Sequence, residues 1–377
     1  MNKINPDGDL IGSTALLTID LTAIGENYAT LSALGQGAQC AAVVKANAYG
    51  TGASQVATYL RAQGCKTFFV ATLDEGIALR DRLPDVGIFI LDGLFPGSSS
   101  MFLQHNLSPL LGSMEMLKEW SASIRAFSSP PSAALHIDTG MNRLGIGPDQ
   151  FEQLLYADVF KNIKLDLIMS HLACADEPDN PRNQKQLELF KSALEKLPSV
   201  PISFANSSGV FLGSDYHFDL LRPGISLYGG RPNDISDNAM RPVVTLTTRI
   251  AQIRTVEKGD AIGYGASYVA TRKTRLATLP VGYADGYPRA LGSSNERKGA
   301  SSYIGEYEAP LLGRVSMDLI TIDITDIPED KAMLGADVEL LGPHILIDDL
   351  ADIAGTISYE ILTSLGARYD RHYKGAD

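Results

Sequence analysis

"QCAAVVKA", residues 39–46, is a short, mostly apolar run that ends next to a lysine, and similar runs recur along the chain. They are "TFFVATL" (67–73), "VGIFILDG" (86–93), "LSPLLGS" (107–113), "AALHID" (133–138), "LDLIMSHLA" (165–173), "PISFANS" (201–207) and "FDLLRPGI" (218–225). Segments with the apolar spacing of helices separate these runs, which indicates parallel βα units. About eight units over roughly 200 residues are typical of a closed (β/α)8 barrel. No GxGxxG motif follows the first run, which argues against a doubly wound sheet.

A different pattern fills residues 241–270, "RPVVTLTTRIAQIRTVEKGDAIGYGASYVA", which alternate like strands broken by glycine, without amphipathic helices between them. We therefore expect an α/β protein with an N-terminal (β/α)8 TIM-type barrel over residues 13–236. A C-terminal, mostly β domain would follow over residues 237–377 and would include residues 1–12. Because "ALLTIDLTAI" is strand-like, residues 13–24 could belong to either the barrel or the β domain.

The composition is that of an ordinary globular protein, since 45% of the 377 residues are hydrophobic and 20% are charged. A formal net charge of -12 argues against nucleic-acid binding, which requires many Lys and Arg facing phosphates. The 3 cysteines are widely spaced, which argues against a disulfide framework, and we expect no metal site. No segment approaches the roughly 20 apolar residues of a membrane span, and the first residues lack a secretory signal. We expect a cytoplasmic protein without a membrane partner.

Polar residues close most of the apolar runs, and in a barrel the carboxyl ends of the strands carry the functional site. By this argument the candidates are Lys45, Asp138, His171, Asn206 and Arg222. A lysine at such a position is often only a solvated charge. The alternative is an amine that loses its proton in a partly desolvated site among other cations and becomes reactive.

Two of the runs lead into turns rich in glycine and small hydroxyl residues, "FANSSGV" (204–210) and "LRPGIS" (221–226). By our count they end the last two barrel strands, where such barrels build phosphate sites from backbone N–H groups. Ser207, Gly224 and Ile225 are the candidates for that site. Each turn taken alone is also consistent with ordinary loop chemistry.

Arg222 and His171 complete the set of candidates. The guanidinium of Arg222 is a permanent cation that demands an acceptor at a barrel mouth, although a salt bridge would also satisfy it. His171 taken alone would be interpreted as an ordinary core histidine. A reactive lysine, phosphate-site turns, an arginine and a histidine at several strand ends of one barrel together predict a pyridoxal phosphate site.

Nine motifs extend this interpretation over nearly the whole chain. They are "AVVKANAYG", "IDTGMNRLG", "SHLACADE", "ANSSG", "RPGISLYG", "GYGASY", "PVGYADGYPR", "GRVSMD" and "TISYEILT". In this order they resemble the bacterial alanine racemase family. The resemblance implies an N-terminal (β/α)8 barrel and a C-terminal β domain, in agreement with the domain pattern above.

The resemblance also implies roles for individual residues toward pyridoxal 5'-phosphate. Lys45 is similar to the lysine that carries the cofactor as an internal aldimine, and Arg222 to the arginine that donates to the pyridine nitrogen. His171 would lie against the ring. The remaining contacts with the cofactor would come from Tyr49, Asn206, Ser207, Gly224, Ile225 and Tyr359. Because a guanidinium does not give up its proton, the pyridine nitrogen would stay unprotonated.

The implied substrates are L-alanine and D-alanine, which are interconverted by proton transfer to either face of a planar carbon. One rigid base reaches only one face, so two bases are expected: Lys45 for the D-isomer and Tyr264 for the L-isomer. Arg143, Met317 and Tyr283 would contact the substrate. The residues that would line the path by which alanine reaches the site are Asp176, Arg289 and Arg314.

The family completes each active site with residues of a second subunit, so the resemblance implies a homodimer with shared active sites. The implied role is the supply of D-alanine for peptidoglycan. Pocket size depends on packing that a sequence does not display, so an amino acid racemase of broader specificity stays open.

Two positions depart from the family pattern. Many members carry a carbamylated lysine where this chain has His136, so Arg143 must be oriented in another way, either by His136 as an acceptor or by a bound chloride. Thr51 stands where a histidine is commoner, and that histidine has no expected chemical role. Neither change affects Lys45, Tyr264 or Arg222.

Two alternatives have similar architecture. A barrel-type basic amino acid decarboxylase would carry a "CDGLD"-like cysteine stretch in its second domain, and no such stretch occurs here. A non-catalytic pyridoxal phosphate carrier would lack the β domain and its tyrosine.

Overall fold

The computed structural model describes residues 14–157, 163–233 and 238–376. They form two compact units. One unit contains residues 24–227 and the described part of 231–240, and the other contains residues 14–23, 228–230 and 241–376. Within these described residues, no helix has the length and apolar character needed to cross a membrane.

The first unit is a barrel of parallel strands. Its strands are β2 (Gln39–Cys40), β3 (Ala42–Val43), β4 (Thr67–Val70), β5 (Gly87–Ile90), β6 (Ser108–Leu111), β7 (Ser132–His136), β8 (Lys164–Met169), β9 (Ile202–Ser203) and β10 (Leu220–Leu221). The strands from β3 to β9 pair in chain order, and β10 pairs in parallel with β2. A bridge between Asn206 and Arg222 joins the ends of β9 and β10, so the ring closes and the expected barrel is confirmed.

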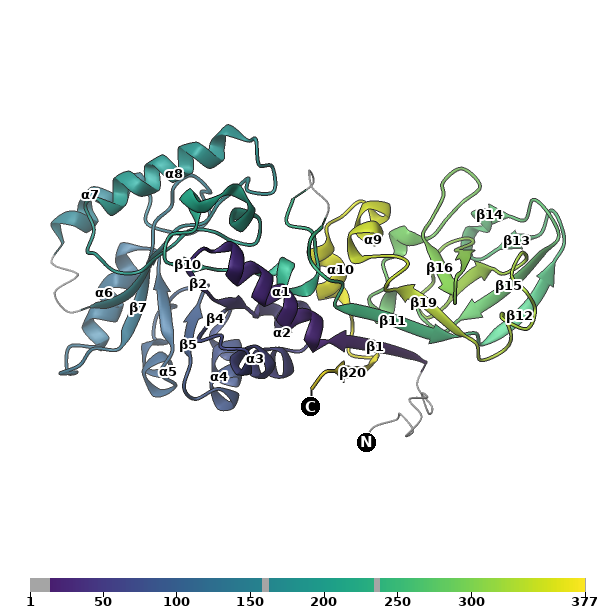
Figure 1. Cartoon of the computed structure of the whole chain (residues 1–377), viewed down its shortest axis with the longest axis horizontal. Helices are drawn as coiled ribbons and strands as arrows, with labels where there is room; N and C mark the ends of the chain where they lie inside the picture. The colour runs from purple at the N-terminus through teal and green to yellow at the C-terminus, as the bar shows by residue number, and fades with distance from the viewer. Residues whose placement is uncertain (1–13, 158–162, 234–237, 377) are drawn as a thin grey trace. The chain divides into compact units, whose positions relative to one another are not determined.

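Helices cover the outside of this ring (Figure 1). They are α1 (Leu21–Leu34), α3 (Ala53–Ala62), α4 (Leu73–Arg82), α5 (Ser99–Gln104), α6 (Met114–Ser123), α7 (Pro148–Tyr156) and α8 (Pro181–Leu194), with the short turn α2 (Lys45–Tyr49) after β3. The barrel strands are buried on both faces, which explains why their sequences are continuous apolar runs. Trp120 and Phe102 pack edge to face between α6 and α5.

The second unit is mostly β, as expected. Its strands are β1 (Ala15–Asp20), β11 (Val244–Arg249), β12 (Gln252–Val256), β13 (Ala261–Ile262), β14 (Tyr268–Val269), β15 (Thr274–Leu279), β16 (Ser301–Ile304), β17 (Tyr307–Pro310), β18 (Ile320–Asp323), β19 (Asp337–Leu341) and β20 (Asp370–Lys374). Its helices are α9 (Ile347–Ala354) and α10 (Ser358–Ser364), with 3-10 turns η5 (Tyr264–Ala266), η6 (Tyr283–Asp285) and η7 (Arg289–Leu291). Within this unit's described residues, the largest sheet has the strand order β17-β16-β19-β11-β1-β20.

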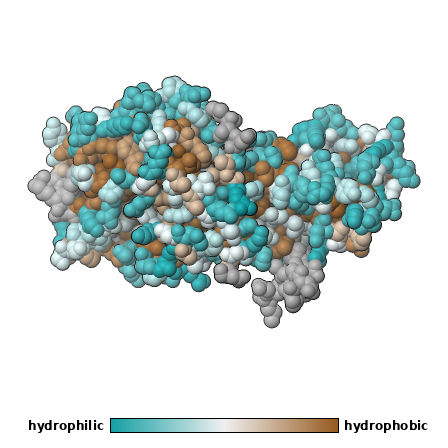
Figure 2. Space-filling view, in the orientation of Figure 1, coloured by the Kyte–Doolittle hydropathy of each residue, from teal (hydrophilic) through white to brown (hydrophobic). Residues whose placement is uncertain are grey.

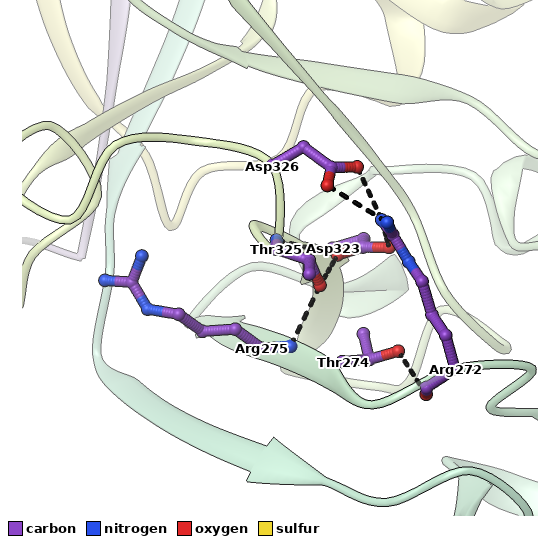
Figure 3. A network of polar contacts seen from close by, with 6 residues as sticks. All are labelled: Arg272, Thr274, Arg275, Asp323, Thr325 and Asp326. Carbon is purple, nitrogen blue, oxygen red and sulfur yellow. Dashed lines mark hydrogen bonds and ion pairs between the residues drawn. The ribbon is translucent and has the colours of Figure 1, made fainter.

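An ion-pair network fixes one edge of the smaller sheet β12-β15-β18 (Figure 3). Arg272, just before β15, reaches Asp326 at 2.5 Å and Asp323 at 3.4 Å. The hydroxyl of Thr325 accepts a hydrogen bond from the backbone N–H of Arg275 at 2.9 Å. These contacts connect the start of β15 with the end of β18.

The structure refines two details of the sequence interpretation. The strand-like "ALLTIDLTAI" is a strand only to Asp20, because the Asp20 carboxylate accepts the N–H of Ala23 at 3.0 Å and starts a helix there. β1 pairs with β11 and β20 in the second unit. After β9, the 3-10 turns η2 (Ser208–Leu212) and η3 (Ser214–Tyr216) replace a regular helix, since the segment is rich in serine and glycine.

Candidate active site

Lys45 follows β3, with only Val44 between them, and opens the turn α2, which has an unusual conformation. The four residues after it, Ala46, Asn47, Ala48 and Tyr49, all have positive φ between 52° and 54°. None of them is glycine, and left-handed backbone costs such residues about 1–2 kcal/mol each. Strain of this kind persists only where surrounding contacts impose it and is concentrated at functional sites.

The environment of Lys45 favours a neutral amine. Burial and then the positive charge of Arg143 lower the pKa of Lys45, while Asp92 and Glu75 act in the opposite direction. Desolvation beside another cation is the setting in which a lysine amine becomes a nucleophile or a base.

Arg222 is the most deeply placed cation of the site. Its side chain is 3% exposed, and it lies over the ring of Phe69 at 5.9 Å. The guanidinium donates to Ser203 Oγ, to the carbonyl of Ser170 at 2.7 Å and to that of Phe204 at 3.5 Å. No carboxylate of the described residues forms an ion pair with it, and burial lowers its pKa to about 9. A guanidinium has five N–H groups, so further donors remain for an incoming acceptor.

The expected phosphate-binding turns lie side by side at the ends of β9 and β10. Ser207 Oγ accepts the N–H of Gly224 at 2.8 Å and that of Ser226 at 3.3 Å. A Cβ on Gly224 would stand 2.2 Å from the hydroxyl of the buried Tyr49, so only glycine lets that ring approach. The backbone N–H of Ile225, at the start of η4 (Ile225–Tyr228), finds no acceptor within the part of the chain that the structure describes. The hydroxyls of Ser207 and Tyr49 and the backbone N–H of Ile225 are hydrogen-bond donors of the kind that bind an anion.

Asn206 and His171 belong to the same rim. The side-chain oxygen of Asn206 accepts the N–H of Gly209 at 2.8 Å and shapes the turn that presents Ser207. Burial, followed by the charges of Arg222 and Arg143, lowers the pKa of His171 well below its usual value. The imidazole is therefore a neutral, flat group at neutral pH.

Arg143 lies in the loop after β7 and is exposed. The carboxylate of Asp138 shapes this loop by accepting backbone N–H groups of residues 140–142 at 2.9 to 3.2 Å. Arg143 lines a cavity of about 380 Å³ together with His136 and Asp92. An exposed guanidinium beside a lysine of lowered pKa can bind a carboxylate.

His136, the departure from the family pattern, ends β7 and is 7% exposed. Its Nδ1 has no hydrogen-bond partner among the described residues. Burial is the main cause that lowers its pKa to about 4, and the charge of Arg222 adds to it while Asp138 opposes it. The side chain is therefore neutral at neutral pH.

Replacing His136 should reduce the acid sensitivity of the fold. The unfolded chain takes up this proton near pH 6.5 and the folded chain only near pH 4, so the unfolded state binds more protons between these values. Stability contributed by the neutral imidazole is present above this window and is lost as the pH falls through it. From pH 7 to pH 5 the unfolding free energy of the wild type should fall by about 2 kcal/mol more than that of His136→Gln. Urea unfolding at both pH values measures this, and equal losses would contradict it.

The remaining predicted residues lie in the second unit and are partly or largely exposed. Tyr264 is 71% exposed, Met317 53%, Tyr283 42% and Tyr359 37%. Tyr283 and Met317 are neighbours, because the N–H of Tyr283 donates to Ser316 O and that of Ala284 to Met317 O, both at 3.0 Å. Tyr359 lies in α10. The predicted set is thus divided between the barrel mouth and exposed positions of the β unit.

The residues expected along the substrate path are divided in the same way. Arg289 and Arg314 line one cavity of about 700 Å³ in the β unit, and Arg314 lies beside the turn that carries Tyr264. Asp176 is an exposed residue of the loop after β8 in the barrel unit.

Three residues at the barrel mouth were missed by the sequence interpretation. Ser203 Oγ accepts a hydrogen bond from the guanidinium of Arg222, and the side chain of Gln186 in α8 donates to the carbonyl of His171 at 3.0 Å. Glu75 accepts the N–H of Ala46 at 2.6 Å. Only Glu75 had a local signal, the T-x-x-E capping box over residues 72–75, and that signal predicts a helix start rather than a contact with the lysine turn.

The mouth of this barrel carries a lysine of lowered pKa and a buried arginine that forms no ion pair with a carboxylate of the described residues. It also carries two turns suited to a phosphate. Together these features place the protein in the class of pyridoxal phosphate-dependent enzymes. Comparisons with known proteins narrow that class. The family model described as "Alanine racemase, N-terminal domain" matches residues 19–232, and "Alanine racemase, C-terminal domain" matches residues 243–373.

Curated relatives agree with this match. The catabolic alanine racemase of Agrobacterium fabrum is 47% identical over 96% of this chain and 92% of its own length. The alanine racemase of Rhodospirillum rubrum is 47% identical over 96% of both chains. Among solved structures, the alanine racemase of Bartonella henselae with covalently bound pyridoxal phosphate has a TM-score of 0.91 and 40% identity, covering 96% of this chain and 99% of that one. This chain belongs to the alanine racemase family.

The residues present fit the cofactor of that family. The buried guanidinium of Arg222, which donates to neutral oxygens and has no carboxylate partner among the described residues, can donate a further N–H to an acceptor that carries no proton, such as a pyridine nitrogen. The N–H of Ile225, which meets no acceptor in the part of the chain that the structure describes, and the nearby hydroxyl of Ser207 suit an anion such as a phosphate. The neutral imidazole of His171 can lie against an aromatic ring.

Proposed function

We propose that this chain is a pyridoxal phosphate-dependent alanine racemase that interconverts L-alanine and D-alanine. The observation that carries the proposal is the position of Lys45, with its lowered pKa, at the mouth of the barrel that also holds the buried Arg222. The family match supports the choice of a racemase over the decarboxylase and carrier alternatives.

Pyridoxal phosphate, when bound, draws electrons from the α-carbon of an amino acid and so makes the proton on that carbon removable. Lys45 would hold the cofactor covalently, and Tyr49, Ser207, Gly224, Ile225 and Tyr359 would hold its phosphate. Arg222 would donate to the ring nitrogen without releasing a proton, which limits how strongly the ring withdraws electrons. His171 and Asn206 would restrain the ring from the side.

Proton transfer to opposite faces of one carbon requires two bases. Lys45 Nζ, whose pKa is lowered by burial and by Arg143, is the proposed base for D-alanine. The phenol oxygen of Tyr264 is the proposed base for L-alanine, and a cation is needed beside it because a free phenol has a pKa near 10. Arg143 would supply that charge and bind the carboxylate of the substrate. Met317 and Tyr283 would limit the size of the substrate, which favours alanine over larger amino acids.

We propose that the active form is a homodimer in which Tyr264 of the partner subunit faces Lys45. Support comes from the exposure of Tyr264, Met317 and Tyr283, since aromatic and methionine side chains are enriched in protein interfaces. Figure 2 shows hydrophobic side chains at the surface of both units, among hydrophilic ones. In such a dimer the β unit of one chain would contribute its tyrosine to the active site that contains Lys45 of the other chain.

We propose a cytoplasmic location and a role in supplying D-alanine for peptidoglycan. The location is supported by the free thiols of Cys40, Cys65 and Cys174, which suit a reducing compartment. The role rests on the family alone, and relatives include an enzyme named catabolic. The same catalyst serves either direction, because metabolite levels set the net flow.

The function is tested by incubating the purified protein, loaded with pyridoxal phosphate, with L-alanine in deuterium oxide. D-Alanine labelled at the α-carbon is the expected product, and L-serine and L-lysine should be converted far more slowly. Release of carbon dioxide instead would favour a decarboxylase. A protein that binds the cofactor but exchanges no α-proton of either isomer would contradict the proposal.

A further inference from the structure

The carboxylate of Glu75 binds two different elements with its two oxygens. Oε2 accepts the N–H of Ala71 at 2.8 Å and that of Thr72 at 3.4 Å, while Glu75 N–H donates to Thr72 Oγ1 at 3.2 Å. This half is a capping box at the start of α4. Oε1 instead accepts the N–H of Ala46, the residue after Lys45, at 2.6 Å. A cap of α4 alone would not require that second contact.

The contact falls where the left-handed turn begins. Inside the turn, Ala48 N–H donates to Val44 O and Gly50 N–H to Ala46 O, both at 2.9 Å. These bonds close the turn on itself but do not set its direction relative to the strands. The Glu75 carboxylate connects its first peptide unit to the loop between β4 and α4, and so to the rigid barrel wall. A charged acceptor makes this bond stronger than one to a neutral oxygen.

We propose that Glu75 is a positioning residue for Lys45, holding the strained turn so that the amine of Lys45 stays at the barrel mouth. This rests on the proposed function of Lys45. The charge of Glu75 also acts on Lys45, since it opposes the lowering of the pKa of that lysine by burial. Loss of the carboxylate would therefore have two effects. It would release the turn after Lys45, and it would remove a negative charge that acts on the Lys45 amine.

The chain contains a matched control for the helix cap. Asp349 in α9 has the same position in its helix as Glu75 in α4, and its Oδ2 accepts the N–H of Leu346 at 2.9 Å. No second segment is held by Asp349 among the described residues. Replacing Asp349 by alanine removes a cap of the same kind without touching the lysine turn.

The first test is steady-state kinetics of Glu75→Ala, Glu75→Gln and Asp349→Ala with both isomers of alanine. Glu75→Ala should lower kcat about 10–100-fold, because misplacing a reacting group acts on the chemical step and a charged hydrogen bond is lost. KM should change less than about threefold. Glu75→Gln keeps a single oxygen, which can accept either the N–H of Ala46 or that of Ala71 but not both, so it should recover only part of the loss. Asp349→Ala should keep the wild-type kcat.

A second readout does not depend on turnover. Amide hydrogen exchange of residues 45–50 should be faster in Glu75→Ala than in wild type and unchanged in Asp349→Ala. Wild-type exchange and wild-type kcat in Glu75→Ala would overturn the proposal, as would equal losses of kcat and melting temperature in Glu75→Ala and Asp349→Ala. If the wild type did not racemise alanine, the proposed function would fail, while the exchange data would still decide whether Glu75 holds the turn.

Discussion

Replacing Lys45 by alanine is expected to lower kcat for alanine racemisation by about 10³-fold or more. The reason is that Lys45 has two proposed tasks, holding the cofactor and accepting the α-proton of D-alanine. Lys45→Arg should be equally inactive, although it keeps the positive charge, because a guanidinium stays protonated and can serve neither as nucleophile nor as base. Racemisation of both isomers and the visible absorption of the bound cofactor are the measurements.

The matched control is Lys66→Ala. Lys66 is exposed and comes just before β4, so it lies at the amino end of a barrel strand, away from the carboxyl ends that carry the site. Its variant should keep wild-type kcat and cofactor absorption. Substantial racemisation by Lys45→Ala, with Lys66→Ala unchanged, would mean that another residue holds the cofactor and that the assignment is wrong.

Much of the fold could be predicted because parallel barrel strands leave a clear signal. A strand buried on both faces is a continuous apolar run, as in "TFFV" of β4 or "LIM" within β8, and helical spacing between runs indicates the crossovers. The limits of single elements depend on hydrogen bonds that such patterns do not show. Asp20 ends β1 by starting a helix, and the segment after β9 folds into 3-10 turns instead of a helix.

The candidate site was predictable where its residues close barrel strands. Lys45, His171, Asn206 and Arg222 were named from that position alone, and the structure gathers them at one mouth. Their partners were not predictable, because Ser203 is an ordinary strand serine until Arg222 folds against it. Nor does "ANAY" suggest four left-handed residues in succession, since no glycine marks them. Such a conformation is imposed by tertiary contacts and not by local preference.

Tyr264→Phe is expected to lower racemisation about 10²–10⁴-fold in both directions while exchange on one isomer survives. The enantiomers have equal free energy, so kcat/KM must fall by the same factor from either side. Exchange of the α-proton with solvent has no such restriction. With the phenol oxygen gone, L-alanine should racemise and exchange in deuterium oxide only at that residual rate, whereas D-alanine should still exchange readily without inversion, because Lys45 can remove and return the proton on its own face.

Tyr307→Phe is the control, since Tyr307 on β17 is another exposed tyrosine of the β unit, 41% exposed, and has no proposed role. It should racemise like the wild type. Loss of exchange on both isomers in Tyr264→Phe would show that the tyrosine acts on the whole site and not on one face. Retained exchange on L-alanine alone would reverse the roles of the two bases, with Lys45 serving the L-isomer. Only exchange confined to D-alanine supports Tyr264 as the second base. In that case, removing the single phenol oxygen largely abolishes proton transfer on one face of the α-carbon and leaves it intact on the other.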